Sequence, residues 1–182
     1  MSDSDLRSSL NDSGAHFNAE RTRRYLLWRR IKENDDLPWN EGKDFVLFIG
    51  LNPSIADEDR LDPTGYRCYD YARRWGYHFL LIGNLYSKIS TVAKAVDFKF
   101  NDPDDRMNND HELAQAIGIA NDTVLAWGTN ADEEIVADFL RRARQVKTRE
   151  LRCLGVNKNG SPKHPLYLSG DSTSVLYVED LK

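Results

Sequence analysis

Four short apolar segments recur along the chain, separated by longer segments with a helical pattern. They are DFVLFIGL at 44–51, HFLLIGNLY at 78–86, DTVLAWG at 122–128 and ELRCLGV at 150–156. The first shows no alternation of apolar and polar residues, which is typical of a strand buried on both faces of a parallel sheet. We therefore expect four mainly parallel strands in these segments.

Helix signals lie between the expected strands. Asp62 followed by proline predicts an N-cap and a helix over about 63–74, which a Trp-Gly pair would end. Asn109 with a glutamate three residues later predicts a capping box and a second helix. Residues 131–145 begin with acids and end with arginines, as the dipole of a third helix favours.

The two ends of the chain add weaker signals. Tyr25, Trp28 and Ile31 form an apolar stripe that predicts a leading helix over about 17–33, and SVLYV near the C-terminus suggests a short edge strand. The alternating order predicts an α/β fold, a three-layer α/β/α sandwich around a mostly parallel four-stranded sheet, plus that N-terminal helix. We expect a flexible tail over 1–15 and one domain over 16–182.

Composition narrows the class of protein. The 182 residues suit one domain, and no apolar run approaches the roughly 20 residues of a membrane helix. The N-terminus lacks the blocks of a signal peptide, so we expect a cytoplasmic protein without membrane contact. Cys68 and Cys153 lie far apart without a CxxC pair, which disfavours a cysteine metal site and indicates two buried small side chains. We expect no cofactor, and nothing in the sequence fixes an oligomeric state.

Charge is distributed unevenly along a chain whose net charge is −4. The segment RTRRYLLWRRIK has six basic residues and no acid. We take Arg23, Arg24 and, later in the chain, Lys163 as candidate nucleic-acid contacts. A solvated helix face is the structural alternative for such a run.

Polar residues follow the expected strands at their carboxyl ends, where ligands bind in sheets of this kind. Asn52 follows the first strand, Asn84 ends the second, and His164 lies in the loop after the fourth. Two carboxamides and an imidazole can hold a planar polar ligand or position a water molecule. The alternatives are a turn at Asn52, a loop tether at Asn84 and an exposed, idle His164.

Nearby residues extend this candidate site. Asp57, Glu58 and Asp59 could hold Mg²⁺ beside a phosphate. A solvated loop before a helix start is the favoured explanation, because carboxylates stabilise helix starts, and we expect no metal. Tyr66 is the aromatic residue expected nearest the crevice, where it would stack on a flat ligand.

The motifs GLNPSIADE, DPT, NLYS, LAWG and HPLYL, in this order, resemble the bacterial and phage family of unknown function DUF1643. The resemblance covers about residues 20–170 and implies no activity.

A more distant resemblance is to the uracil-DNA glycosylase superfamily, in particular its mismatch-specific branch. GLNP at the first strand end, GNLY at the second, VLAWG on the third and HPL after the fourth carry it. It implies that Asn52 positions the attacking water, Asn84 reads the edge of a flipped-out base, and His164 stabilises charge on the departing base. The remaining substrate-binding residues would be Pro53, Ser54, Tyr66 and Gly128.

Two departures from that superfamily bear on the substrate. Leu166 stands where its loop has serine, and the acidic segment after Ser54 would repel a DNA backbone. The expected function is therefore hydrolysis of an N-glycosidic bond in DNA or in a free nucleotide. The alternatives are a non-catalytic nucleotide- or base-binding module and a Mg²⁺-dependent nucleotide hydrolase or transferase.

Overall fold

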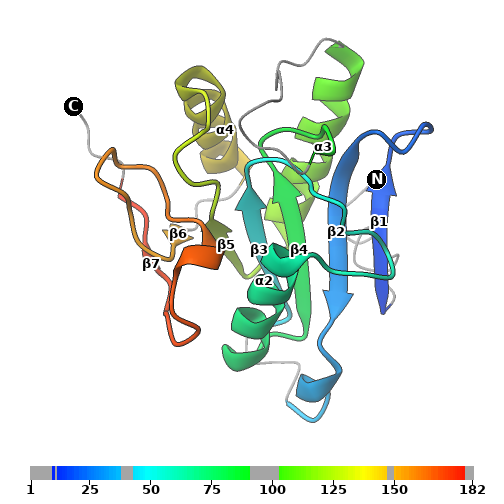
Figure 1. Cartoon of the computed structure of the whole chain (residues 1–182), viewed down its shortest axis with the longest axis vertical. Coiled ribbons are helices and arrows are strands. Elements are labelled where there is room, and N and C mark those ends of the chain that lie inside the picture. Colours follow the sequence, from blue (N-terminus) through cyan, green and yellow to red (C-terminus); the bar gives the residue numbers. More distant parts are fainter. Residues whose placement is uncertain (1–9, 11, 38–42, 91–102, 147–149, 179–182) are drawn as a thin grey trace.

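The computed structural model describes residues 10, 12–37, 43–90, 103–146 and 150–178, which form one sheet with helices on both faces (Figure 1). The strands are β1 (Ser13–Phe17), β2 (Arg24–Arg30), β3 (Phe45–Gly50), β4 (Phe79–Asn84), β5 (Asp122–Leu125), β6 (Leu151–Cys153) and β7 (Val175–Leu176). The helices are α2 (Pro63–Arg74), α3 (Pro103–Ile119) and α4 (Glu133–Val146), with 3₁₀ turns η1 (Lys32–Asn34) and η2 (Pro165–Tyr167).

The sheet is mixed and has seven strands among the described residues, in the order β1-β2-β4-β3-β5-β6-β7. Its central strands β4, β3, β5 and β6 are parallel to one another. On one side of them β2 pairs with β4 and β1 with β2, on the other side β7 pairs with β6, and all three of these pairs are antiparallel. The expected α/β class and the four central strands are confirmed. The expectation of a mostly parallel four-stranded sheet of the uracil-DNA glycosylase type is wrong, because three further strands extend it through antiparallel pairs into a mixed sheet of seven described strands.

The expected leading helix is also wrong. Residues 24–29 are all buried, and this segment forms strand β2 between β1 and β4. A strand buried on both faces shows a continuous apolar run, and four consecutive large apolar residues after Arg24 satisfy that pattern as well as a helical stripe. Pairing with β4 decides between the two structures, since it covers the edge that β4 would otherwise expose.

Helix α2 begins as the sequence predicts. Asp62 is its N-cap, and its carboxylate accepts a hydrogen bond of 2.6 Å from the backbone N–H of Gly65. Gly76, just after the helix, has φ of +83°, which only glycine adopts easily.

Helix α3 begins at Pro103, and the predicted capping box at Asn109 is wrong. Asn109 lies inside the helix, is fully buried, and donates from Nδ2 to the carbonyl oxygens of Asn84 and Leu85 at 3.2 and 3.4 Å. A side chain that resembled a cap thus ties α3 to the end of β4.

Two apolar clusters fill the space on either side of the sheet. Helix α2 packs over one face through Cys68, Tyr71 and Ala72, and Figure 1 shows η2 beside it in front of the sheet. Helices α3 and α4 cover the other face with residues such as Leu113 and Phe139. The layers therefore leave the carboxyl ends of the central strands open at one edge, where loops meet.

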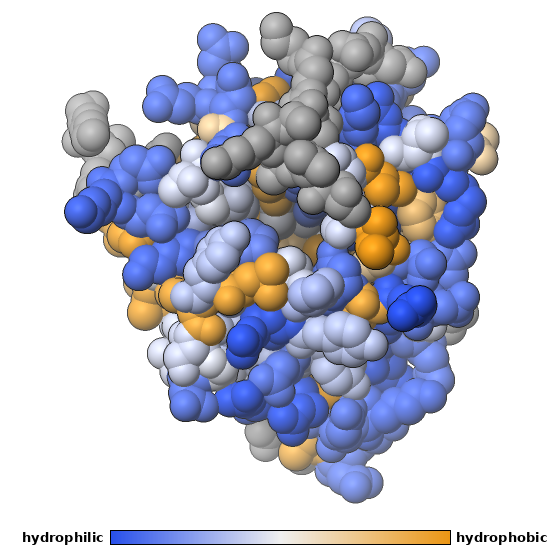
Figure 2. Space-filling view, in the orientation of Figure 1, coloured by the Kyte–Doolittle hydropathy of each residue, from blue (hydrophilic) through white to orange (hydrophobic). Residues whose placement is uncertain are grey.

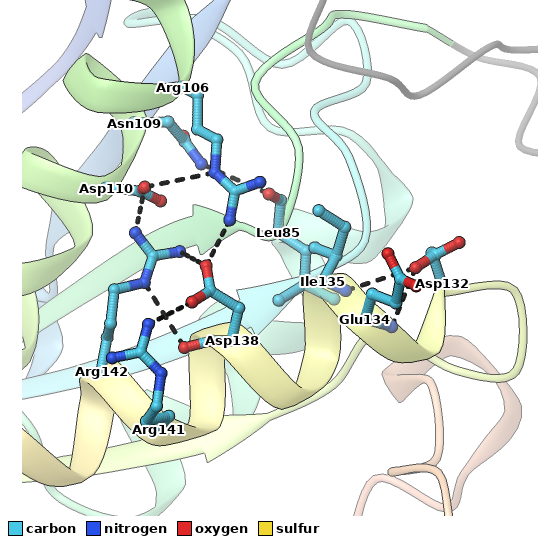
Figure 3. Close-up of polar contacts among 10 residues, drawn as sticks. All are labelled: Leu85, Arg106, Asn109, Asp110, Asp132, Glu134, Ile135, Asp138, Arg141 and Arg142. Carbon is cyan, nitrogen blue, oxygen red and sulfur yellow. Dashed lines mark hydrogen bonds and ion pairs between the residues drawn. The ribbon is translucent and has the colours of Figure 1, made fainter. Parts of the chain in front are cut away.

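An arginine–aspartate network joins α3 to α4 (Figure 3). Asp138 of α4 contacts Arg106 of α3 as well as Arg141 and Arg142 of its own helix. Arg142 also contacts Asp110 of α3. The two helices are thus fastened by charges that cross between them as well as by their apolar faces.

Both cysteines are free and buried, as expected. The expected C-terminal edge strand is present as β7, which pairs with β6. The expected tail falls mainly on residues 1–9 and 11, outside the described part, while Ser13–Phe17 forms β1. None of the helices in the described part of the chain has the length and apolar character needed to cross a membrane.

Candidate functional site

A pocket of about 420 Å³ opens at the carboxyl ends of the parallel strands, within the size range of small-molecule sites. Residues that follow β3, β4, β5 and β6 line it, and so does the N-terminal turn of α2. Asn52, Asn84 and His164, which the sequence places at three strand ends, all line this one pocket. Their catalytic and binding roles stay predictions.

The carboxamide of Asn52 has a defined orientation. Its Nδ2 donates to the backbone carbonyl oxygens of Pro53 and Ser90, at 3.1 and 2.9 Å. Oδ1 is the remaining polar atom, and the described residues give it no donor. Asn52 can therefore accept a hydrogen bond from a ligand or a water molecule while its other end stays fixed.

Asn84 is a buried amide whose hydrogen bonds are incomplete. The residue is 4% exposed, and its Nδ2 has no acceptor within the described residues. It lies opposite Gly50 in the β3–β4 register, and a Cβ at Gly50 would come within 2.7 Å of Oδ1. An unmade hydrogen bond of this kind costs about 1–3 kcal/mol. Glycine at position 50 thus makes room for an amide that the fold alone does not satisfy.

His164 lines the pocket and is the N-cap of η2. Its Nδ1 accepts a hydrogen bond of 3.4 Å from the backbone N–H of Leu166, so a neutral ring carries its proton on Nε2. Burial lowers the pKa of the imidazole below its ordinary value, although Asp62 acts in the opposite direction. At neutral pH His164 can therefore offer a neutral N–H donor.

Several of the remaining lining residues are apolar and chemically inert. They include Leu27, Phe48, Ile82, Ala126 and Cys68. Burial raises the pKa of the Cys68 thiol, so it stays protonated and is no nucleophile at neutral pH. Such walls favour a flat ligand whose polar groups lie at its rim.

Arg24 is the charged residue that sequence reasoning placed differently. It was a candidate for surface contact with nucleic acid, but it is 3% exposed and lines the pocket. Its Nη1 donates to the carbonyl oxygen of Ala56, while burial lowers its pKa to about 10 and leaves it charged at neutral pH. The signal was present in the sequence as an arginine directly before a continuous apolar run.

Other predicted site residues lie elsewhere or at the rim. Ser54 and Gly128 line the pocket, and a Cβ at Gly128 would lie 3.6 Å from the Cβ of His164. Tyr66 is 62% exposed and does not line it. Tyr167, which the sequence reasoning did not select, does so from the outer surface.

Pro53, Lys163 and Arg23 are not pocket-lining residues either. Pro53 contributes its carbonyl oxygen to the Asn52 contact. Arg23 lies 3.3 Å from the buried carboxylate of Asp105 and so forms an internal ion pair. Arg23 and Arg24, the two candidate nucleic-acid contacts of this segment, therefore do not lie on an exposed helix.

The acidic loop is occupied by internal contacts. Asp57 Oδ1 accepts from the backbone N–H groups of Asp59 and Arg60, and Glu58 pairs with Arg21 at 2.7 Å. Among the described residues no three His, Cys, Asp or Glu side chains group as a metal site would require. Asp57 and Glu58 therefore stabilise the loop that carries Ala56 toward Arg24.

The face of the molecule that carries α2 is mainly hydrophilic (Figure 2). Figure 2 shows apolar residues there in small separate patches rather than in one broad surface. For the described residues of this face, the pocket rather than a broad apolar surface is thus the candidate ligand site.

Comparison with known proteins places the chain in a family whose function is unknown. The model of a family described as "Protein of unknown function (DUF1643)" matches residues 24–166. No curated protein and no solved structure gave a match. The matched range begins at Arg24 and includes Asn52, Asn84 and His164.

Proposed function

We propose, for a chain that belongs to the DUF1643 family of proteins of unknown function, that its pocket binds a nucleobase and hydrolyses the N-glycosidic bond joining it to a sugar. The observation that carries this proposal is the meeting of three oriented or unsatisfied polar side chains in one pocket with apolar walls. Within the described part of the chain, Asn52 has an acceptor without a donor, His164 has a donor without an acceptor, and the amide nitrogen of Asn84 is unpaired.

Each group has a distinct part in the proposed reaction. The Oδ1 atom of Asn52 accepts a hydrogen bond from water and holds its oxygen toward the anomeric carbon of the sugar. That oxygen forms the new C–O bond as the C–N bond breaks, and the bonding electron pair leaves with the base. The proton lost by the water passes to solvent or to the departing base. An amide is a poor base, so placement matters more here than proton abstraction.

His164 would stabilise the departing base. A carbonyl oxygen of the base gains negative charge as the bond breaks, and the Nε2–H group can donate to it. A neutral imidazole is sufficient for this role because it is fixed by η2 and needs no proton transfer. Asn84 would accept or donate at the edge of the base and so select among bases.

The test is a base-release assay on nucleotides and on oligonucleotides that contain uracil or damaged bases. We expect free base from at least one substrate, with or without a metal chelator. Asn52→Ala should lower the rate by about 100-fold or more, since placement of the nucleophile is lost. The free energy of unfolding of Asn52→Ala should be lower by about 1–2 kcal/mol, because two hydrogen bonds to backbone carbonyls are lost.

Asn34→Ala is the matched control, because Nδ2 of Asn34 also donates to two backbone carbonyl oxygens, those of Arg73 and Tyr77, and the residue does not line the pocket. Its rate should equal that of the natural protein. Absence of released base from every substrate would contradict the proposal, and tight binding without release would favour a non-catalytic binding module. Activity that disappears with the chelator would instead favour the metal-dependent hydrolase.

A further inference from the structure

The guanidinium of Arg24 is buried in the pocket, and the described residues provide no carboxylate that forms an ion pair with it. The residue is 3% exposed, its Nε has no acceptor, and its one hydrogen bond within the described chain goes to the carbonyl oxygen of Ala56. Across the described residues no carboxylate lies within 4.0 Å of it. Removing such a charge from water costs several kcal/mol unless something compensates for it.

A second arginine increases this local positive charge. Arg29 on the same strand is 8% exposed and donates to the carbonyl oxygens of Trp28 and Asp57. Ala56 and Asp57 are adjacent, so both arginines reach the same loop. Arg29 does not line the pocket, however, which leaves Arg24 as the cation that faces a ligand there.

The antiparallel direction of β2 explains how Arg24 reaches the site. Leu27 pairs with Ile82, and the backbone N–H of Arg24 donates to the carbonyl oxygen of Ser87, beyond the end of β4. The first residue of β2 therefore lies at the carboxyl end of the parallel strands. A helix in this segment, as the sequence suggested, would not fix the residue there.

Groups that suit an anion also line the pocket. Ser54, Thr64 and Gly65 line it, and the last two belong to the first turn of the 12-residue helix α2, whose N-terminal end carries partial positive charge. Asp62 is the opposing charge in the pocket, and one of its oxygens is engaged with the N–H of Gly65. Its other oxygen is suited to accept from a sugar hydroxyl.

We infer that Arg24, with the hydroxyl groups of Ser54 and Thr64, forms a phosphate subsite, and that the substrate of this pocket is a nucleotide with a terminal phosphate. This inference rests on the proposed function for the identity of the base-binding part. It goes further by selecting a free nucleotide over a polymer. The buried position of Arg24 is the reason, because a terminal phosphate carries one substituent and can reach a buried guanidinium, whereas a phosphodiester carries a chain on both sides.

Calorimetric titration with matched probes tests the inference. The probes are the common deoxynucleoside 5′-monophosphates, the corresponding nucleosides, inorganic phosphate and a short single-stranded oligonucleotide without a terminal phosphate. We expect one monophosphate to bind at least 10-fold more tightly than its nucleoside and than the oligonucleotide. Arg24→Gln should abolish that preference because it removes the positive charge, and Arg24→Lys should restore part of it.

Arg29→Gln is the matched control, since Arg29 lies on the same strand, is buried and contacts the same loop without lining the pocket. It should keep the preference for the monophosphate. Equal affinity for nucleoside and monophosphate, or the same preference in Arg24→Gln, would overturn the inference, as would an oligonucleotide that binds as well as the monophosphate. Phosphate binding that depends on Arg24, without any base preference, would support the subsite and contradict the proposed function.

Discussion

Single residues define the chemistry of the pocket because their hydrogen bonds fix which atom faces a ligand. Asn52 uses its amide nitrogen on two backbone carbonyls, and His164 uses Nδ1 on a backbone N–H. The sequence predicts Asn84 for a physical reason, since a buried amide inside an apolar run requires a partner. It does not predict that Arg24 lines the pocket, because the apolar residues after Arg24 fit both a helical stripe and a buried strand.

The buried imidazole gives a pH-dependent contribution to stability. Burial lowers the pKa of His164 below 6.5, so the unfolded chain binds the proton more tightly than the folded one. The contribution of the neutral ring is complete above about pH 6.5 and is lost as the pH falls through the lower folded-state pKa. Between pH 8 and 5, denaturant unfolding should show a larger loss of stability for the natural protein than for His164→Gln. Parallel curves for the two proteins would contradict this prediction.

Individual elements bring these residues together through register. The β3–β4 pairing sets Gly50 opposite Asn84, and Asn109 of α3 holds the backbone at the end of β4. The strands β3 to β6 and the caps of α2 could be predicted from the sequence because each has a local signal. The pairing of β2 with β4 could not, since it depends on a contact between segments about 50 residues apart in the chain.

Gly50→Ala tests whether register positions Asn84. A Cβ at this position would lie 2.7 Å from Asn84 Oδ1, and the buried amide has little space to move. We expect the free energy of unfolding to fall by about 1–3 kcal/mol and ligand binding to weaken at least 10-fold. Gly170→Ala is the control, because its Cβ would lie 2.9 Å from the end of Arg74, a long and partly exposed side chain that can move aside. Equal effects of the two substitutions would refute the prediction.

At the scale of the whole molecule, one face of the sheet is closed by helices and one edge carries the pocket. Helices α3 and α4 close one face of the sheet and are fastened by the network around Asp138 (Figure 3). The pocket lies at the carboxyl edge of the sheet, between its central strands and α2. Changes in the network should therefore alter stability without altering the chemistry of the pocket.

Asp138→Asn provides the corresponding prediction. Burial acts to raise the pKa of Asp138, but its arginine partners overcome this and hold the pKa below the ordinary value. The substitution should lower the free energy of unfolding by about 1 kcal/mol at low salt and by less at 1 M salt. The side chain of Asp171, which pairs with Arg74, is 91% exposed, so Asp171→Asn should leave the free energy of unfolding unchanged. Base release by either variant should be unchanged, and a loss of activity in Asp138→Asn would show that the two sides are coupled.

The most direct measurement of the central claim follows the oxygen atom of water into the product. The natural protein is incubated in water enriched in ¹⁸O with a nucleotide or oligonucleotide that binds its pocket. The masses of the free base and of the sugar-containing product are then measured by mass spectrometry. Hydrolysis of the N-glycosidic bond predicts a free base without label and a sugar product that gains one ¹⁸O atom from water as the C–N bond is cleaved. A substrate that binds and stays intact, or a label found on phosphate, would contradict the assignment of Asn52 and His164 to this reaction.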